Sequence, residues 1–564
     1  MNDHSIAFIT CVNDEEQYEE CLRYINNLNI PEGYEIEVVS IKEAESITAG
    51  YNAAMKSTES KYKIYLHQDT YIINKRFIYD ILEIFNTDDK IGLIGVIGAK
   101  KMPTNGIWWD SKNRIGKVYE SHTGKMDLLS FDDFEESYCD AEVVDGLLMA
   151  TQYDISWRED IFDGWHYYDA SQCVEFIKSG YKVVISKQDK PWVQHDCGIV
   201  NIKNGFEYYR ELFLGEYSKY IFPLVSILIP TYNRPEYFKL ALDSALNQTY
   251  KNIEVFIGDD STNNETEKLI KKDYLGKYEN IHYYHNSQNL GQFENDIKLF
   301  EMSNGEFINY LMDDDLFENT KIEKMMNYFI QDINKEISIV TSHREIIDLN
   351  GNKKGIFGNT NEIFKEDKIF EGVKLGDFIL KTNFNCIGES TTALFRKNKL
   401  NEAFGVFNKR EYGCNVDQAS WFNLLSNGQA VFINDVLSYF RIHNNQQLAS
   451  DKMKLLGALD YSHMVLTGRE KGFLLNNEDF KTALNSCLKY CKSVLQYFNH
   501  LEDKEKYIQI LGNLQKNIKI MEKSINKYSL IRDIQKVKGN SKRKKVLFIA
   551  YIFPPLGGSG VQRS

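Results

Sequence analysis

Six mostly apolar residues run directly into three aspartates in Phe307-Ile308-Asn309-Tyr310-Leu311-Met312-Asp313-Asp314-Asp315. The apolar part has the length and composition of a short buried strand, and an open α/β sheet binds its ligands at the carboxyl ends of its strands. Three adjacent carboxylates repel one another unless a cation neutralises them, and their hard oxygens suit Mg²⁺ or Mn²⁺. This stretch, the Asp triplet and its strand, predicts a metal-bound nucleotide at a sheet edge; a solvated acidic turn is the alternative.

A second acidic pair, Asp259-Asp260, follows the strand-like run Ile253–Ile257. Because the carboxyl ends of parallel strands meet at one edge of a sheet, we expect this pair to lie beside the Asp triplet. A carboxylate there accepts hydrogen bonds from a ribose hydroxyl or a base N–H, while Asp313 and Asp315 divide the ribose and metal contacts. Two acidic clusters at successive strand ends favour nucleotide binding over a chance acidic turn.

The first part of the chain repeats this order of elements. Ser5–Thr10 and Val225–Thr231 are both short apolar runs typical of buried parallel strands, and each precedes a polar turn, an amphipathic helix and a second strand. The trio His67-Gln68-Asp69 stands where the later copy has the Asp triplet. Strands alternating with helices indicate a mostly parallel sheet, and the repeated order indicates two copies of one domain type, at residues 1–222 and 223–448.

The periodicity becomes helical after the second copy. Residues 449–543 are predicted to form a helical extension or linker, in which one apolar stripe serves helix packing: Leu484, Leu488, Cys491, Val494, Leu495 and Phe498. Residues 544–564 have the pattern of one further strand and a Gly-rich loop, which cannot bury a core alone.

The composition limits the classes of function. The 564 residues carry a formal net charge of −13, so nucleic acid, which needs a basic face, is not expected as a partner. The first residues show no signal-peptide pattern, and no apolar stretch approaches the roughly 20 residues that span a bilayer. Nine cysteines without a CxxC pair speak against a zinc or disulfide framework. We expect a cytoplasmic protein without an integral membrane segment, compatible with peripheral association at the inner face of the cell membrane.

Three motifs together resemble glycosyltransferase family 2, which has the GT-A fold: Val225–Arg234, Gly258–Ser261 and the Asp triplet. The resemblance covers residues 223–450 and implies an inverting transferase with a nucleotide-sugar donor and Mn²⁺ or Mg²⁺. By position it implies that Asp315 ligates the metal and that Asp313 lies near the ribose. The residues it places at the nucleotide sugar are Thr231, Tyr232, Asp259, Asp260, Asp313 and Asp314.

Inversion by direct displacement needs one general base to take the proton of the acceptor hydroxyl. The resemblance places this carboxylate before a late helix, and its best match is Asp417 in Asn415–Trp421. Val416 departs from the Glu-Asp pair common in the family, and a helix N-cap is an alternative or additional role for Asp417. The segment Tyr439–His443 resembles the late Tyr-Arg-x-His of the family. It implies that Arg441 helps at the diphosphate and that His443 completes the metal shell or binds the diphosphate. A structural role is the alternative for His443.

The first domain resembles a divergent branch of the same superfamily over residues 5–205. One carboxylate, Asp69, remains in the trio, and no acidic pair follows the second strand. The segments Asp145–Ala150 and Gly164–Asp169 look like the acceptor and base segments of that branch. The base candidate is therefore Asp169, the metal ligands are Asp69 and His195, and the nucleotide-sugar contacts are Thr10, Asn13 and His67. An active transferase with a reduced metal site is expected, with an inactive copy as the alternative.

The last residues, 545–564, resemble the start of a family 4 transferase of the GT-B fold. The matching residues are Phe553-Pro554-Pro555 and Gly557–Arg563. The chain is therefore expected to be a fragment of a longer protein with several transferase domains, and a natural tail is the alternative.

These observations predict an α/β protein with two tandem GT-A domains, each with a Rossmann-like, mostly parallel sheet, plus a helical C-terminal segment. The expected function is a bifunctional inverting glycosyltransferase that builds a bacterial surface glycan. Its donor would be a UDP-, dTDP- or GDP-sugar, and its acceptor a glycan, lipid-linked or glycoprotein hydroxyl. The alternatives are a single-activity transferase with a non-catalytic first domain, a nucleotidyltransferase and a glycan-binding protein without catalysis.

Overall fold

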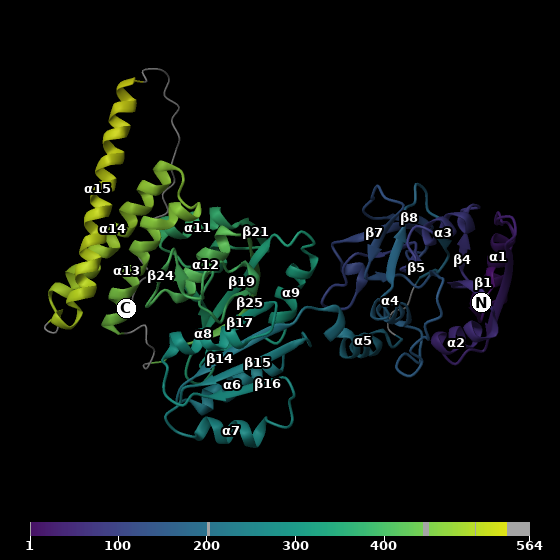
Figure 1. Cartoon of the computed structure of the whole chain (residues 1–564), viewed down its shortest axis with the longest axis horizontal. Helices are drawn as coiled ribbons and strands as arrows, with labels where there is room; N and C mark the ends of the chain where they lie inside the picture. The colour runs from purple at the N-terminus through teal and green to yellow at the C-terminus, as the bar shows by residue number, and fades with distance from the viewer. Residues whose placement is uncertain (1, 200–203, 444–449, 502–503, 539–564) are drawn as a thin grey trace. The chain divides into compact units, whose positions relative to one another are not determined.

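The computed structural model of the chain describes residues 2–199, 204–443, 450–501 and 504–538 (Figure 1). The chain divides into two compact units, Met1–Phe222 and Pro223–Ser564. The strand and Gly-rich loop predicted within residues 544–564 lie outside the described residues.

The first unit is built on a seven-stranded sheet in the order β2-β1-β3-β11-β5-β12-β9. Strand β1 pairs in parallel with β2 and β3, and β12 pairs in parallel with β5, while β11 enters antiparallel between β3 and β5. The strands are β1 (Asn2–Val12), β2 (Glu35–Lys42), β3 (Ser60–Leu66), β5 (Ile91–Gly95), β9 (Tyr138–Ala141), β11 (Leu148–Thr151) and β12 (Lys182–Ser186).

A second sheet of the first unit has the order β10-β6-β7-β13-β4, with β8 paired to β7. Its strands are β4 (Thr70–Ile72), β6 (Ile97–Ala99), β7 (Arg114–Glu120), β8 (Asp127–Ser130), β10 (Val143–Val144) and β13 (Val193–His195). Strand β4 starts directly after Asp69, and its antiparallel pairing with β13 sets His195 opposite Thr70. The helices are α1 (Glu15–Asn26), α2 (Ile47–Ser57), α3 (Phe77–Phe85), α4 (Tyr168–Lys178) and α5 (Phe206–Ile221).

The second unit is built on a ten-stranded sheet in the order β16-β15-β14-β17-β22-β19-β25-β18, with β20 and β21 at its side. Strands β14 to β17 are parallel, β22 is antiparallel to β17 and β19, and β25 is parallel to β19. The strands are β14 (Val225–Thr231), β15 (Ile253–Asp259), β16 (Ile281–His285), β17 (Phe307–Tyr310), β18 (Leu316–Phe317), β19 (Ile337–Ile347), β20 (Lys353–Ile356), β21 (Lys368–Glu371), β22 (Leu394–Arg396) and β25 (Gln429–Arg441).

The two units share one strand order. The series β2-β1-β3-β11-β5-β12 of the first unit matches β15-β14-β17-β22-β19-β25 of the second, including the single antiparallel strand in the fourth place. The prediction of two copies of one α/β domain is therefore confirmed. In the first unit, the short strand β4 follows the polar trio and pairs antiparallel with the late strand β13. In the second unit, β18 follows the Asp triplet and pairs antiparallel with the late strand β25 in the same way. Each pairing places a late segment of the chain beside the polar residues.

The strands form where the sequence is continuously apolar. All seven residues of β14 are buried, as expected for a central parallel strand covered on both faces, and its bounds agree with the predicted ones. Strand β17 ends at Tyr310, two residues before the predicted end. The Leu311 N–H still donates to the Leu228 carbonyl over 2.8 Å, and the turn begins at Met312, whose carbonyl accepts a hydrogen bond from the Asp315 N–H.

Helices cover the sheet of the second unit and extend beyond it. They are α6 (Pro235–Leu246), α7 (Glu265–Asp273), α8 (Gln292–Met302), α9 (Lys321–Gln331), α10 (Thr360–Ile363), α11 (Gly372–Thr382), α12 (Val416–Ser426), α13 (Asp451–Thr467), α14 (Asn477–Asn499) and α15 (Ile508–Lys538). The last three confirm the predicted helical segment (Figure 1). The apolar stripe predicted on α14 packs on the core of this unit, with Leu484, Cys491 and Phe498 fully buried.

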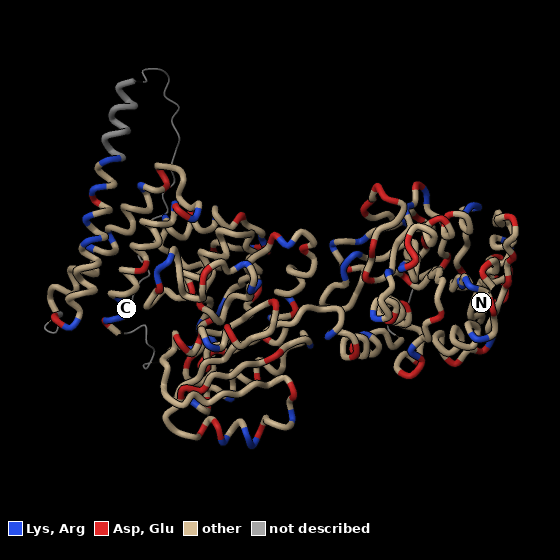
Figure 2. The backbone as a smooth tube through the Cα atoms, viewed as in Figure 1, with Lys and Arg blue, Asp and Glu red and all other residues tan. Residues whose placement is uncertain are grey.

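Charged residues of both signs alternate along the two units (Figure 2). Within the described ranges, no helix combines the length and the apolar character needed to cross a membrane.

Candidate active site

The Asp triplet follows β17 at the edge where the neighbouring strand β14 also ends. Thr231 Oγ1 donates to Asp313 Oδ2 over 2.9 Å, and the Tyr232 N–H donates to the same oxygen over 3.2 Å. Arg234 Nη1 lies 3.1 Å from Asp313 Oδ1 and 3.0 Å from Asp314 Oδ2. A cationic side chain therefore bridges two of the three carboxylates, which lowers their mutual repulsion.

Asp315 is the most buried member of the triplet, with 1% of its surface exposed. Its Oδ2 accepts a hydrogen bond from Thr391 Oγ1 over 2.7 Å, and its Oδ1 accepts one from the Arg441 N–H over 3.1 Å. Burial, and then the charge of Asp314, raise the pKa of Asp315 well above the usual value for an aspartate. A buried carboxyl of this kind needs a proton or a cation, so the residues present fit a divalent metal ion.

The segment Tyr439–His443 lies beside the Asp triplet, because β18, which follows the triplet, pairs antiparallel with β25. His443 Nε2 lies 2.8 Å from Asp314 Oδ2, so the structure brings His443 to Asp314, whereas the sequence placed it in one metal shell with Asp315. Arg441 is 1% exposed, and its Nε donates to the Asp314 carbonyl oxygen over 2.8 Å. It supports the backbone of the triplet, and the diphosphate contact of Arg441 stays a prediction.

The acidic pair lies beside the triplet on the same sheet edge, because Thr231 at the end of β14 is in register with Asp259 at the end of β15. Asp259 is fully buried and accepts a hydrogen bond from the Tyr283 hydroxyl over 2.7 Å. Asp260 accepts one from the Gly291 N–H over 2.9 Å. The contacts of this pair with a nucleoside stay predictions.

A cleft of about 610 Å³ opens at this edge. Its lining includes Thr231, Tyr232, Asp260, the whole Asp triplet, Glu389 and Asp417. The structure therefore brings these predicted donor residues and the predicted base into one space, although about 100 residues of chain separate the triplet from Asp417. Asp259, Arg441 and His443 do not line this cleft.

Asp417 is the second residue of α12, and its Oδ1 accepts a hydrogen bond from the Gln418 N–H over 2.7 Å. The N-cap residue of this helix is Asn415, so the alternative in which Asp417 caps the helix is wrong. Burial, and then the charge of Glu389, raise the pKa of Asp417 to about 7, although the Gln418 N–H and Arg344 lower it. A carboxyl that titrates near neutral pH is well matched to accept a proton from a reacting hydroxyl.

We expect the pKa of Asp417 to appear in the pH profile of the second domain. Because a base works in its ionised form, kcat/KM should rise about tenfold per pH unit below 7 and level off above it. Replacing Glu389 with Gln removes a neighbouring negative charge and should move this limb to lower pH. The measurement is kcat/KM from pH 5 to 9 for both proteins; an unmoved limb in Glu389→Gln would assign the titration to another group.

Sequence reasoning missed Glu389 and Arg344. Arg344 is 3% exposed and its Nε lies 2.5 Å from Glu389 Oε2, so an ion pair between a buried arginine and a partly exposed glutamate flanks the base. Nothing in one sequence distinguishes Glu389 from other acidic loop residues, because its role depends on strand β19 bringing Arg344 to it. The bridging role of Arg234 was also missed, although its place in the motif Val225–Arg234 was a usable signal.

Helix α13 holds the loop that leads to the base, which sequence reasoning also missed. Asp460 is fully buried, and its Oδ2 accepts hydrogen bonds from the three N–H groups of residues 413–415 over 3.2, 2.9 and 3.2 Å. Its Oδ1 accepts one from Arg410 Nη2 over 2.6 Å. Gly413 and Cys414 of this loop line the cleft, and the helix of Asp417 begins directly after it. The C-terminal helices are therefore part of the site.

Replacing Asp460 with Asn should lower kcat more than it changes donor affinity. The amide cannot accept all four hydrogen bonds, so the loop before Asp417 shifts, and a displacement of about 1 Å at a reacting group can lower a rate roughly 100-fold. Steady-state kinetics with a thermal melt check this expectation. If kcat stays unchanged while the melting temperature falls, Asp460 supports the fold alone.

The first domain places its base candidate in the same way. Asp169 is the second residue of α4; its Oδ1 accepts a hydrogen bond from the Ala170 N–H over 2.8 Å and its Oδ2 accepts one from the Gly146 N–H over 3.1 Å. Burial, and then the charge of Asp145, raise the pKa of Asp169 to about 7. Both base candidates therefore share a helix position, a hydrogen bond to the next N–H and a raised pKa.

The structure brings together His67, Asp69 and His195, three side chains predicted for the first site. Next to them, the Asn13 N–H donates to Gln68 Oε1 over 2.9 Å, which links the turn after β1 to the polar trio. Thr10 lies on β1 and is 1% exposed. The contacts of Thr10, Asn13 and His67 with a nucleotide sugar stay predictions.

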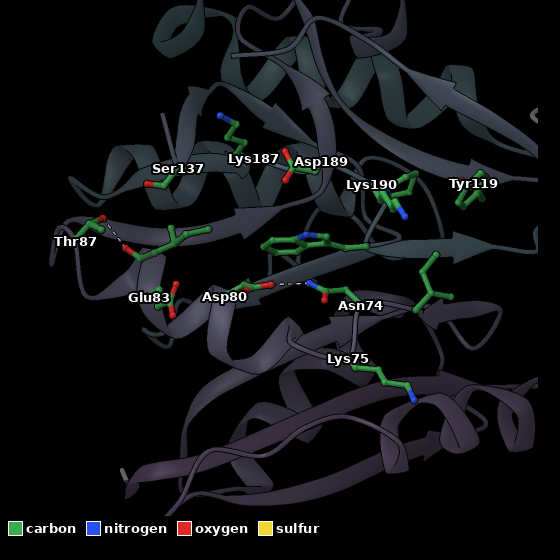
Figure 3. A pocket seen from close by; sticks show the side chains of 14 residues that line it. Asn74, Lys75, Asp80, Glu83, Thr87, Tyr119, Ser137, Lys187, Asp189 and Lys190 are labelled. Carbon is green, nitrogen blue, oxygen red and sulfur yellow. Dashed lines mark hydrogen bonds between the residues drawn. The ribbon is translucent and has the colours of Figure 1, made fainter. Parts of the chain in front are cut away.

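A separate groove of about 1030 Å³ lies in the first unit (Figure 3). It begins where β4 ends and β13 starts, which is the end of this strand pair opposite to His195. Asn74 and Trp192 line it, and Asn74 Nδ2 donates to Asp80 Oδ2 over 2.7 Å at its wall. None of the predicted site residues lines this groove.

Comparisons with known proteins match both units to glycosyltransferase families. Residues 226–400 match the family described as glycosyl transferase family 2, and residues 7–217 match the family described as glycosyltransferase like family. The chain belongs to the glycosyltransferases of the family 2 type. Its two transferase domains stand in tandem, and each match falls within one compact unit.

Curated relatives match parts of this tandem transferase. An uncharacterised glycosyltransferase of Rickettsia typhi is 30% identical over 226 residues, which is 40% of this chain and 65% of that protein. One of Methanocaldococcus jannaschii is 35% identical over 156 residues, 28% of this chain and 52% of that protein. The chain thus spans about half to two thirds of the length of these relatives. The UDP-Glc:alpha-D-GlcNAc-diphosphoundecaprenol beta-1,3-glucosyltransferase WfaP of Escherichia coli is 26% identical over 279 residues, 48% of this chain and 96% of that protein.

Solved structures are more distant. One of them is residues 1–349 of TarS from S. aureus in complex with UDP, which is 16% identical to this chain in sequence. The superposition covers 57% of this chain and 94% of the TarS chain and has a TM-score of 0.39. The mannosyltransferase PcManGT from Pyrobaculum calidifontis in complex with GDP-Man and Mn²⁺ is 12% identical, covers 56% of this chain and 92% of that chain, and has a TM-score of 0.33. These scores are too low to show which residues correspond.

Proposed function

We propose that the second domain transfers a sugar from a nucleotide-sugar donor to an acceptor hydroxyl with inversion, and that the first domain is a separate transferase. The observation that carries this proposal is the cleft in which the Asp triplet and Asp417 meet. Acidic residues at the carboxyl edge of a parallel sheet suit a nucleotide with its metal, and a carboxyl titrating near pH 7 suits a general base.

The proposed reaction is a single displacement. The acceptor oxygen attacks the anomeric carbon, Asp417 takes the proton of that hydroxyl, and the bond from the anomeric carbon to the diphosphate oxygen breaks. Asp315 would ligate Mn²⁺ or Mg²⁺, which would neutralise the charge of the leaving nucleoside diphosphate, and His443 would support this site through its contact with Asp314. Arg234, already bridging Asp313 and Asp314, lies where it would add positive charge at the same place.

The proposal of two activities rests on the likeness of the two base sites. Asp169 and Asp417 occupy the second position of equivalent helices, and both have pKa values raised to about 7. Burying an ionisable carboxyl in this way destabilises the fold at neutral pH, so two such groups at matching places favour a functional role for both.

The activity in the name of WfaP suggests which substrates to test first. We propose a UDP-sugar donor and an acceptor linked to a lipid diphosphate, because this relative is matched over 96% of its length. Such an acceptor would bring the cytoplasmic enzyme to the inner face of the cell membrane, where a growing surface glycan is assembled.

A thermal-shift screen of UDP-, dTDP- and GDP-sugars with Mn²⁺ tests the proposal. A donor at about 100 times its Kd stabilises the folded chain by about 2.7 kcal/mol, which a melting curve resolves. Transfer should then release a nucleoside diphosphate. Release of pyrophosphate instead would favour a nucleotidyltransferase, and the absence of any shift with all three donor classes would contradict the proposal.

A further inference from the structure

Helix α15 carries apolar and charged residues on opposite faces. Leu514, Ile518 and Met521 are buried in the core of the second unit, where α15 packs on α13 and α14. Because an α-helix turns by about 100° per residue, positions 516, 519, 523 and 527 fall within about 80° of one another, on the side opposite to these buried residues. All four positions are exposed, and all four are lysines, which together form the lysine face: Lys516, Lys519, Lys523 and Lys527.

No acidic side chain neutralises the lysine face within the part of α15 whose side chains the structure describes. The one acidic residue there, Glu522, is paired with Lys492 of α14 over 2.7 Å. Ile520 lies between the lysines on the same side of the helix and is 43% exposed. The lysine face therefore presents positive charge and one apolar side chain to its surroundings.

The charge of this region differs from that of the rest of the chain. Residues 516–545 contain eleven Lys and Arg against two Asp and Glu, a formal net charge of +9. The whole chain carries −13, so the remaining residues carry −22. Figure 2 shows Lys and Arg recurring along the described part of α15. A positive region concentrated on one helix of an acidic protein favours one-sided binding to an anionic surface.

We propose that the lysine face docks the enzyme on the acidic phospholipid headgroups of a membrane. Clusters of about four to eight Lys or Arg on one helix bind anionic bilayers. The apolar side of α15 is occupied by the protein core, so docking is electrostatic and reversible, with Ile520 adding a shallow apolar contact. The described part of the face has no aromatic or arginine side chain on which bases could stack, which favours lipid over nucleic acid.

This inference rests on the proposed function only for the purpose of docking, since an acceptor linked to a lipid diphosphate lies in the same membrane. Helix α13, on which α15 packs, also holds the loop before Asp417 through Asp460. The docking helix and the proposed base therefore belong to one packed unit. Transfer to a lipid-linked acceptor should be faster in anionic vesicles than in neutral ones, whereas transfer to a soluble acceptor should not depend on docking.

The test sediments the full chain with vesicles of phosphatidylcholine, alone or with about 30% phosphatidylglycerol as the acidic lipid. The chain should bind the anionic vesicles alone and dissociate in high salt, because the screening length falls from about 10 Å at 0.1 M to about 3 Å at 1 M. Each lysine near such a surface contributes roughly a fivefold factor, so Lys516→Gln with Lys523→Gln should lower the partition coefficient about 25-fold. Lys516→Glu with Lys523→Glu should lower it further.

The matched control is Lys272→Glu with Lys277→Glu, which makes the same change of charge at exposed positions in and after α7. It should bind the anionic vesicles far better than the reversal on α15. The proposal is overturned if the chain binds neither vesicle or both equally. It is also overturned if folded variants of the lysine face bind like the parent or only as weakly as the control.

Tighter binding of the parent to polyuridylic acid than to anionic vesicles would overturn the proposal in favour of nucleic acid. Melting curves show which variants are folded, and the glutamine pair replaces the glutamate pair if charge reversal prevents folding. Sugar transfer to a soluble acceptor should be the same in the parent and in every variant. A failure of docking would leave that transfer intact, and a failure of transfer would leave vesicle binding intact, so the two proposals fail separately.

Discussion

Asp417→Asn is expected to lower kcat for sugar transfer by the second domain by a factor of roughly 10²–10⁴, the usual contribution of a general base. The amide has the same shape but cannot take the proton of the acceptor hydroxyl. Donor affinity should change little, because the Asp triplet in the same cleft is untouched. Transfer rates at saturating donor, combined with donor titration, check both parts.

The variant should stay folded. The pKa of Asp417 is raised in the folded protein, so its contribution to stability is present below about pH 4 and lost as the pH rises through 7. Removing the charge should therefore leave the melting temperature at pH 8 equal or higher. Asp479→Asn is the matched control, since Asp479 also lies in the first turn of a helix, α14, but outside the cleft. An unchanged kcat in folded Asp417→Asn would remove this residue from the reaction.

Asp315→Asn is expected to reduce metal-dependent transfer by about a thousandfold. Stabilising the charge of a leaving group through a metal ion is worth several kcal/mol, and each 1.36 kcal/mol corresponds to a factor of ten. The loss should appear as weaker donor binding in the presence of Mn²⁺ as well as slower release of the nucleoside diphosphate.

The control for this variant is Asp435→Asn, because Asp435 lies on β25 in an exposed ion pair with Lys324, outside the cleft. An Mn²⁺ titration of the transfer rate separates the two proteins. Full metal-dependent transfer by Asp315→Asn would show that Asp315 does not ligate the metal ion. Asp314 would then be the next residue to test, because it contacts His443.

The sequence was sufficient for the features that depend on local pattern. Continuous apolar runs predicted β14 with its observed bounds, and their repetition predicted two copies of one α/β domain, which the shared strand order confirms. The motifs that follow these strands placed the Asp triplet on the sheet edge, and the family resemblance led to Asp417 in the same cleft, although Asp417 lies in the first turn of α12 and not before it.

Features created by pairing between distant segments could not be predicted. Each of three such features joins residues that lie 45 or more positions apart. They are the antiparallel strand in each sheet, the ion pair of Arg344 and Glu389, and the hydrogen bonds of Asp460 to the loop before α12. No periodicity in one sequence encodes such contacts. The same limit explains His67, which was predicted as a donor contact but faces Asp69 and His195 once β13 pairs with β4.

The central claim is that one chain carries two transferase sites, and mixing two inactive-site variants tests it most directly. Full chains carrying Asp169→Asn or Asp417→Asn are incubated with acceptor and donors, separately and as an equal mixture, and the products are weighed by mass spectrometry. Each variant alone should stop short of the product of the unmodified chain, and the mixture should restore it. Formation of the complete product by Asp169→Asn alone would show that the first domain does not transfer a sugar.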